Sequence, residues 1–222
     1  MTTFLLLRHA HSTANEAGIL AGRIEGVGLS VVGRKQAHNL VKALKDVTVD
    51  RIISSPLPRC IDTVTMVAVT RRQRIHRDER FIEMDYGQWS GRKLKELAKE
   101  KSWKQIQSKP SSFAFPHGES FTGAALRIEK GLKALMRKYP HKTILIVTHG
   151  DIIKIALQLS NGGPLDNFQH FLVDTCSLSE IHWTPQSRTI VRSNSRLVKV
   201  SSLAIAKSRI KNRRIVGGGA GV

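Results

Sequence analysis

Cysteine is scarce in this chain of 222 residues, which contains only Cys60 and Cys176. Two cysteines so far apart form no disulfide framework and match no zinc-ligand spacing, so we expect two buried free thiols. No apolar run approaches the roughly 20 residues that span a bilayer. The apolar run near the N-terminus is too short for a signal peptide, and no small-residue cleavage site follows it. The sequence therefore predicts a cytoplasmic protein without a membrane segment or a disulfide scaffold.

Acidic residues are also scarce, because 17 Asp and Glu stand against 36 Lys and Arg and give a net charge of +19. A surface of this kind attracts phosphorylated metabolites or polyanions. The excess is uneven, since every charged residue in 186–222 is basic. Such a tail either contacts nucleic acid or serves as a solubilising extension, and no aromatic residues are interleaved in it for base stacking. We favour the solubilising role and keep nucleic-acid binding as an alternative.

Two short apolar runs each end at a histidine. Residues 4–7 are all apolar and lead into Arg8 and His9, and residues 143–147 lead through a threonine into His149. Runs of this length and composition are typical of strands buried on both faces of a parallel sheet. Ligands of an open α/β sheet bind just beyond the carboxyl ends of its strands. We therefore expect His9 and His149 to meet at one end of the sheet.

Helical and strand patterns alternate along the rest of the chain and predict a single α/β domain over residues 1–192. We expect three layers, with a mostly parallel central sheet, helices on both faces and an antiparallel contribution late in the chain. The expected helices cover 30–44, 57–69, 92–106, 121–138 and 151–159, and the further strands cover 50–54, 71–77, 169–173, 177–183 and 188–192. A small helical cap is inserted at about 92–120, and 193–222 form a basic, glycine-rich tail that we expect to be disordered.

The same end of the sheet should gather the side chains that phosphoryl transfer requires: Arg8, His9, Arg59, His149 and, from an adjacent loop, Glu83. Arginine makes bidentate contacts with phosphate oxygens. A neutral imidazole can attack phosphorus and form a covalent intermediate. A carboxylic acid with a pKa raised by burial can protonate the departing alkoxide. This chemistry works by positioning and charge stabilisation and needs no metal or other cofactor.

Five motifs in this region resemble those of the histidine phosphatase superfamily, in the branch that includes cofactor-dependent phosphoglycerate mutase. Residues 8–10 (Arg-His-Ala) are similar to the Arg-His-Gly signature, and residues 54–63 resemble the Ser-Ser-Pro-Leu-x-Arg helix. Residues 83–91 are similar to the acid-bearing loop of the broad-specificity phosphatases, 117–120 to the Gly-Glu-Ser element and 147–150 to the second histidine motif. The motifs occur in the family's order and extend over about residues 3 to 183.

The resemblance implies a role for each matching position. His9 would be the nucleophile that becomes phosphohistidine, and Glu83 the general acid that later activates water, with Asp85 as the rival acid in the same loop. The phosphoryl oxygens would be held by Arg8, Arg59 and His149, with help from Asn15. Gly22, in the glycine-containing loop 12–28, would let the backbone approach the ligand. The expected ligand is a small phosphoester.

Two substitutions and one missing motif distinguish this chain from the family that it resembles. Ala10 replaces the usual glycine, which is tolerable where φ is negative, and His11 stands where Glu or Gln is common. The mutase's tandem arginines have no counterpart between 92 and 120, which favours a phosphatase over the alternative, a phosphomutase. Among the remaining histidines His11 is the only candidate to line the pocket, and Trp89 is expected to be a packing anchor.

Overall fold

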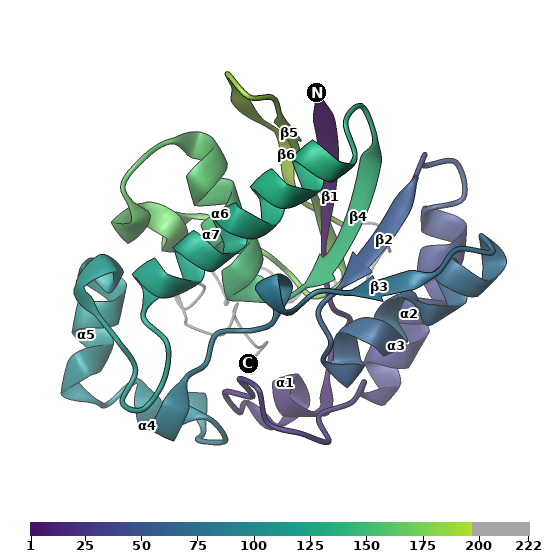
Figure 1. Cartoon of the computed structure of the whole chain (residues 1–222). Helices are drawn as coiled ribbons and strands as arrows, with labels where there is room; N and C mark the ends of the chain where they lie inside the picture. The colour runs from purple at the N-terminus through teal and green to yellow at the C-terminus, as the bar shows by residue number, and fades with distance from the viewer. Residues whose placement is uncertain (197–222) are drawn as a thin grey trace.

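A computed structural model describes residues 1–196 of the chain and contains one six-stranded sheet (Figure 1). The strands are β1 (Thr2–Arg8), β2 (Arg51–Ser54), β3 (Ile75–Arg77), β4 (Thr143–Thr148), β5 (Ser177–Trp183) and β6 (Arg188–Arg196). Their spatial order is β3-β2-β4-β1-β5-β6. The first four are parallel to one another, whereas β5 runs antiparallel to both β1 and β6. This confirms the predicted α/β class with a mostly parallel sheet.

Helices cover both faces of the sheet, as predicted. They are α1 (Thr13–Ala17), α2 (Val31–Ala43), α3 (Pro58–Thr70), α4 (Leu94–Leu97), α5 (Lys101–Ser108), α6 (Phe121–Lys138) and α7 (Gly150–Asn161). Figure 1 shows α2 and α3 on one side and α6 and α7 on the other. Along β1, Leu5 and Leu7 belong to the core under α2 and α3, while Phe4 and Leu6 belong to the core under α6 and α7. Because neighbouring residues of a strand face opposite sides, a strand covered on both faces must be apolar throughout.

The register of β1 and β4 decides where the two histidines leave the sheet. Arg8 lies opposite Thr148 at the end of the parallel pair. The His9 amide then donates to the Thr148 carbonyl at 2.9 Å, one residue beyond the strand. His149 directly follows Thr148 and precedes α7. Parallel pairing therefore delivers both histidines to the same edge, which is the carboxyl end of the sheet.

Helix α2 packs unusually close to the loop that follows β1. It starts at Ser30, whose hydroxyl accepts from the Gly33 amide at 3.1 Å. The Ser30 amide donates to the His11 carbonyl at 2.9 Å. A Cβ atom placed on Gly33 would lie 1.9 Å from that same carbonyl oxygen. Only glycine fits at this position, so α2 supports the loop carrying His9 by direct backbone packing.

Several expected elements differ in the structure, and one of them is the strand expected over 71–77, which is confined to β3 at Ile75–Arg77. Residues 169–173 were expected to form a strand, but a 3₁₀ helix covers Leu165–His170, and Phe168 packs on Phe121 with ring centroids 5.1 Å apart. The expected helix over 92–106 is broken between α4 and α5. Positions 97 and 103 are about 240° apart on one continuous helix, so the break lets Leu97 and Trp103 face the same core. The loop over 12–28 contains the short helix α1.

The last strand, β6, continues to Arg196, four residues beyond its expected end at 192. The remainder of the predicted tail, 197–222, lies outside the described residues, as does most of the segment on which the nucleic-acid alternative depends. The division into a domain over 1–192 with a cap at about 92–120 stays a prediction.

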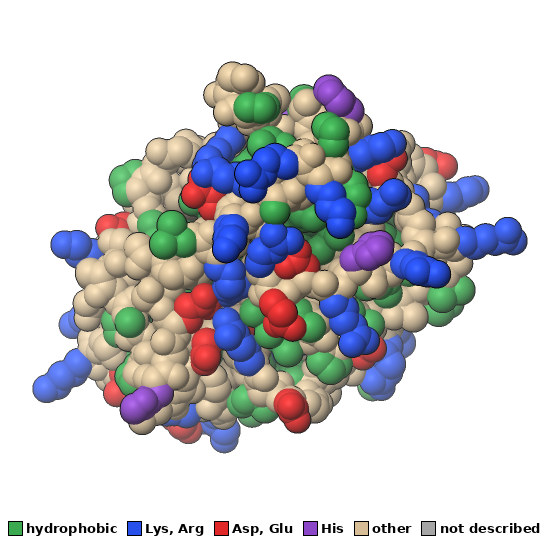
Figure 2. All heavy atoms as spheres, viewed as in Figure 1, with side chains coloured by type: hydrophobic (Ala, Val, Ile, Leu, Met, Phe, Trp, Pro, Cys, Tyr) green, Lys and Arg blue, Asp and Glu red, His purple; other side chains and the backbone are tan. Residues whose placement is uncertain are grey.

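Across residues 1–196, none of the helices has the length and apolar character needed to cross a membrane. Lysine and arginine side chains are spread over the face shown in Figure 2, with acidic side chains between them.

We expect Gly33→Ala to lower the free energy of unfolding by about 1–3 kcal/mol, the usual range for overpacking. Helix propensity alone predicts the opposite sign, because alanine is the better helix former by roughly 1 kcal/mol. Chemical denaturation measures the change. The matched control is Gly123→Ala in α6, where the nearest heavy atom to a new Cβ is the Ser120 hydroxyl at 3.1 Å. A Gly33→Ala protein as stable as the wild type would contradict the close approach of α2.

Candidate active site

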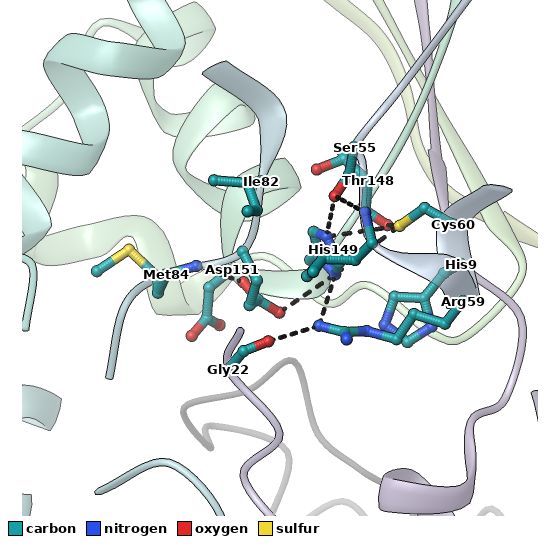
Figure 3. A network of polar contacts seen from close by, with 12 residues as sticks. His9, Gly22, Ser55, Arg59, Cys60, Ile82, Met84, Thr148, His149 and Asp151 are labelled. Atoms are coloured by element: carbon teal, nitrogen blue, oxygen red, sulfur yellow. Dashed lines mark hydrogen bonds and ion pairs between the residues drawn. The ribbon is translucent and has the colours of Figure 1, made fainter. Parts of the chain in front are cut away.

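The two histidines lie side by side at the carboxyl end of the sheet (Figure 3). The ring centroids of His9 and His149 are 5.2 Å apart and their planes meet at 62°. Both rings are buried, with 4% and 0% of the residue surface exposed. Each follows a strand whose residues are nearly all buried, so the backbone at both histidines is held in place by the core.

His9 is held as a neutral imidazole with a defined tautomer. Its Nδ1 lies 2.8 Å from the Ala10 carbonyl oxygen. Because a carbonyl oxygen only accepts, Nδ1 carries the proton and Nε2 keeps its lone pair. Burial, followed by the charges of Arg59 and Arg8, holds the pKa of His9 well below its ordinary value. At neutral pH this side chain therefore has the protonation state of a nucleophile.

Two buried guanidinium groups accompany the histidines. Arg59, in the first turn of α3, donates through Nη2 to the Gly22 carbonyl at 2.8 Å, and the same atom lies 3.3 Å from Nδ1 of His149. Its Nη1 is buried and has no hydrogen-bond partner among residues 1–196. Arg8 donates through Nη1 to the Val173 carbonyl at 2.7 Å. Buried guanidinium groups that include an N–H donor without a hydrogen-bond partner form a site for an anion with several oxygens.

His149 is fixed by contacts on both ring nitrogens. Since Arg59 can only donate, Nδ1 of His149 is the acceptor in that contact, and Nε2 carries the proton. Nε2 then donates to the Ser55 hydroxyl at 2.7 Å, and Cys60 Sγ lies 3.5 Å away. Burial and the neighbouring Arg59 and His9 hold the pKa of His149 well below its ordinary value. This second imidazole is therefore also neutral.

Glu83 lies at the same site as a carboxyl group that resists ionisation. Its Oε1 accepts from the Met84 amide at 3.0 Å, and its Oε2 lies 3.6 Å from His149 Nδ1. The residue is 5% exposed. Burial, and after it the negative charge of Asp151, raise the pKa of Glu83 to about 7. A carboxyl group with that pKa can act as an acid and, after losing its proton, as a base.

Asp85, the other acid of this loop, faces away from the site. Its side chain is 41% exposed and lies 3.8 Å from the Arg23 guanidinium. One of its oxygens accepts from the Gly87 amide at 2.9 Å. These contacts shape the loop at the surface, so Glu83 is the acid that the structure brings to the histidines.

A small pocket opens beside His9, with a polar side and an apolar side. It is lined by His9, Ser12, Asn15, Ile19, Leu20, Ala21, Gly22, Arg59, Glu83, Tyr86 and Leu94. Asn15 belongs to a capping box, in which its Oδ1 accepts from the Ser12 amide at 3.0 Å and from the Ser12 hydroxyl at 2.9 Å. This leaves the Asn15 amide nitrogen as the donor for a ligand. Gly22 contributes its carbonyl to Arg59 and has a φ of +53°, where glycine is favoured.

The structure also places Ala10, His11 and Trp89, about which the sequence raised specific expectations. Ala10 is not among the residues with positive φ, so the alanine is accommodated without backbone strain. His11 does not line the pocket, because its Nδ1 lies 2.9 Å from the Ser30 hydroxyl of the α2 cap. Trp89 is a packing anchor, as expected, since its ring stacks on Trp103 with centroids 6.0 Å apart.

Five residues of the site were not singled out by sequence reasoning: Ser55, Cys60, Tyr86, Asp151 and Lys154. Ser55 and Cys60 lie in the same motif as Arg59, and their closeness to Arg59 in the sequence was the signal that could have identified them as site residues. The last two lie in an otherwise apolar helix, where 150–160 are nearly all buried. Charged residues within such a helix are rare and are a usable signal for a polar site.

Comparison with known proteins shows extensive similarity. The family profile described as histidine phosphatase superfamily (branch 1) matches residues 4–196. Phosphoserine phosphatase 1 of Hydrogenobacter thermophilus is 29% identical over 196 residues, which cover 87% of this chain and 92% of that protein. A Proteus mirabilis protein named "Probable phosphoglycerate mutase GpmB" is 27% identical over 186 residues, covering 82% and 86%. The crystal structure of the alpha-ribazole phosphatase from Shigella flexneri superimposes with a TM-score of 0.77 and 29% identity, covering 89% and 98%.

Both thiols should resist alkylation in the folded protein. Burial raises the pKa of Cys60 and of Cys176 to about 12, from 9.0. The thiolate fraction is then lower by about 10³-fold, and the thiolate is the reactive form. We expect iodoacetamide at pH 8 to leave native protein unmodified by mass spectrometry, while protein in urea takes two labels. Rapid labelling of native Cys60 would show that this side of His149 is open to solvent.

Proposed function

The chain belongs to the histidine phosphatase superfamily, and on that basis we propose that it hydrolyses small phosphomonoesters through a phosphohistidine on His9. The observation that carries the proposal is the state of His9, which is neutral with Nε2 unprotonated. It lies beside Arg59, whose buried Nη1 has no partner among residues 1–196. A nucleophile and an unfilled anion site thus share one pocket.

The first half-reaction transfers the phosphoryl group to the enzyme. His9 Nε2 attacks phosphorus, a P–N bond forms and the ester P–O bond breaks. Arg8 and Arg59 stabilise the charge on the phosphoryl oxygens, with His149 and Asn15 placed to assist. Glu83 gives its proton to the departing alkoxide, so the alcohol leaves neutral.

The second half-reaction returns the enzyme to its starting state. The Glu83 carboxylate accepts a proton from water while the water oxygen attacks the phosphorus. The P–N bond breaks, inorganic phosphate leaves, and His9 is again neutral. One carboxyl group serves both steps because its pKa, raised to about 7, allows either form near neutral pH.

Transfer to water is favoured over transfer to a second substrate. A phosphomutase also has to hold an anionic or phosphorylated acceptor, which requires cations beyond the transferred phosphoryl group. Ile19, Leu20 and Leu94 give the pocket an apolar share of its lining, and Arg59 is the one arginine or lysine among the described residues that line it. The phosphomutase alternative is decided by product analysis, because it predicts a new phosphoester in place of inorganic phosphate.

Replacement of His9 tests the proposal directly. We expect His9→Ala to lower phosphate release by at least about 10⁴-fold, as in other enzymes that lose their nucleophile. Wild-type protein quenched during turnover should carry an acid-labile, base-stable phosphoryl group at residue 9, detected by mass spectrometry, and chelator should leave the rate unchanged. The control is His38→Ala, which removes an exposed histidine of α2. Undiminished activity of His9→Ala would exclude this mechanism.

The role of Glu83 predicts a pH dependence. An acid with a pKa of about 7 is protonated below that pH and ionised above it, so kcat/KM for an alkyl phosphate should decline as the pH rises past about 7. We expect Glu83→Gln to abolish this decline and to lower kcat/KM by about 10²–10⁴-fold. An aryl phosphate, whose leaving group needs less protonation, should lose much less.

The matched control is Asp85→Asn, which keeps the acceptor for the Gly87 amide but removes the charge of the surface acid. It should retain the wild-type rate and pH profile. The reverse outcome, with Asp85→Asn impaired and Glu83→Gln active, would transfer the acid role to Asp85.

A further inference from the structure

A buried ion pair next to the site has no part in the reaction steps above. Asp151 and Lys154 are 0% and 1% exposed, and Lys154 Nζ lies 3.7 Å from Asp151 Oδ1. The Tyr86 hydroxyl, also fully buried, donates to Asp151 Oδ2 at 2.8 Å. Removing two charges from water is expensive, and apolar side chains of similar volume often give equal or greater stability. Stability alone therefore gives little reason to bury these three side chains, Tyr86, Asp151 and Lys154, which we call the triad.

The position of the triad connects it to catalysis. Asp151 lies in the first turn of α7, two residues after His149. Tyr86 lies three residues after Glu83 in the acid-bearing loop. Their hydrogen bond therefore joins the loop that carries the acid to the helix that follows the second histidine. Figure 3 shows Asp151 within the same polar cluster as His149 and Arg59.

We propose that Asp151 is a positioning residue for the general acid: held by Tyr86 and Lys154, it fastens the Glu83 loop to α7, and its negative charge acts on Glu83. The inference rests on the proposed function, since it assumes that Glu83 acts as the acid. It adds a second carboxylate that never contacts substrate.

Groups of both charge signs lie around Glu83, including the Arg23 guanidinium, which donates to the Glu83 backbone carbonyl at 2.9 Å. The guanidinium groups of Arg59 and Arg8 and the Met84 amide favour its ionised form, and neutral His149 lies 3.6 Å away. Burial and Asp151 favour the protonated form and prevail, which gives the raised pKa. Without Asp151, burial alone would oppose the two arginines, so the pKa of Glu83 would be lower and less of the enzyme would hold the proton for the leaving group.

Lys154 and Tyr86 both contact Asp151 and affect how strongly its charge favours the protonated form of Glu83. The ammonium group of Lys154 partly neutralises the Asp151 carboxylate, so it weakens the effect on Glu83. The pKa of Tyr86 is raised well above its ordinary value by burial and by Asp151, so the phenol keeps the proton that it donates. Within the triad, Asp151 favours the protonated form of Glu83, Lys154 weakens that effect, and Tyr86 holds Asp151 in place.

Three single variants test this division by their pH profiles of kcat/KM with one alkyl phosphate. Asp151→Asn keeps an acceptor for the Tyr86 hydroxyl but removes the charge, and we expect the alkaline decline to move to lower pH by about one unit. Lys154→Met removes the ammonium group that faces Asp151 and so strengthens the effect of the Asp151 charge on Glu83, and the decline should move to higher pH. Tyr86→Phe should lower kcat without moving the decline to lower pH. A merely structural role would not produce shifts of opposite sign.

The outcomes separate the inference from the proposed function. An Asp151→Asn enzyme with the wild-type profile, or shifts of the same sign in Asp151→Asn and Lys154→Met, would overturn the inference while phosphohistidine still forms on His9. Thermal unfolding checks that each variant is folded. Where a single variant fails to fold, the double variant Asp151→Asn/Lys154→Met removes both charges together. Its decline should again lie below that of the wild type, and an unmoved decline overturns the inference.

Discussion

The parallel pairing of β1 with β4 is the constraint on which the site depends. Both strands are apolar and covered on both faces, so their register is held by the core and not by the site. His9 and His149 follow these strands directly and inherit that rigidity. A shift of one residue would exchange the two faces of a strand, so that each of its apolar side chains would meet the opposite core. The geometry of the reacting groups is therefore a consequence of ordinary core packing a few residues away.

Burial then determines the protonation states that the chemistry needs. Burial, reinforced by the charges of the two arginines, keeps His9 and His149 neutral, and in the proposed mechanism the neutral form lets His9 act as the nucleophile. The same arginines favour ionisation of Glu83, which is the wrong state for an acid. A site that binds a phosphoryl group through buried cations therefore needs an opposing influence on its carboxyl group. Desolvation supplies most of it, and the negative charge of Asp151 supplies a further part.

Much of this architecture was predictable because it follows from local patterns. The apolar runs before His9 and His149 predicted two covered strands, and Ser30 predicted the start of α2. The failures have physical reasons that a single window of sequence does not contain. The alternating pattern at 169–173 suits a strand, but a 3₁₀ helix that extends to His170 takes the first of these residues, and the preceding Phe168 packs on Phe121 of α6. The contact between Tyr86 and Asp151 joins residues 65 apart in sequence, so only the folded chain brings it into view.

The basic character of the chain has two physically separate consequences. On the surface, lysines and arginines such as Lys130, Arg137 and Lys138 on α6 are exposed, and salt screens such charges within about 10 Å at 0.1 M. They attract anions in general and raise encounter rates without choosing among them. Arg8 and Arg59 are fully buried, where screening is weak and every donor has a fixed direction. In the proposed mechanism, selectivity for a phosphoryl group therefore resides in these two side chains, and the large net charge of the surface affects how often a phosphoester arrives.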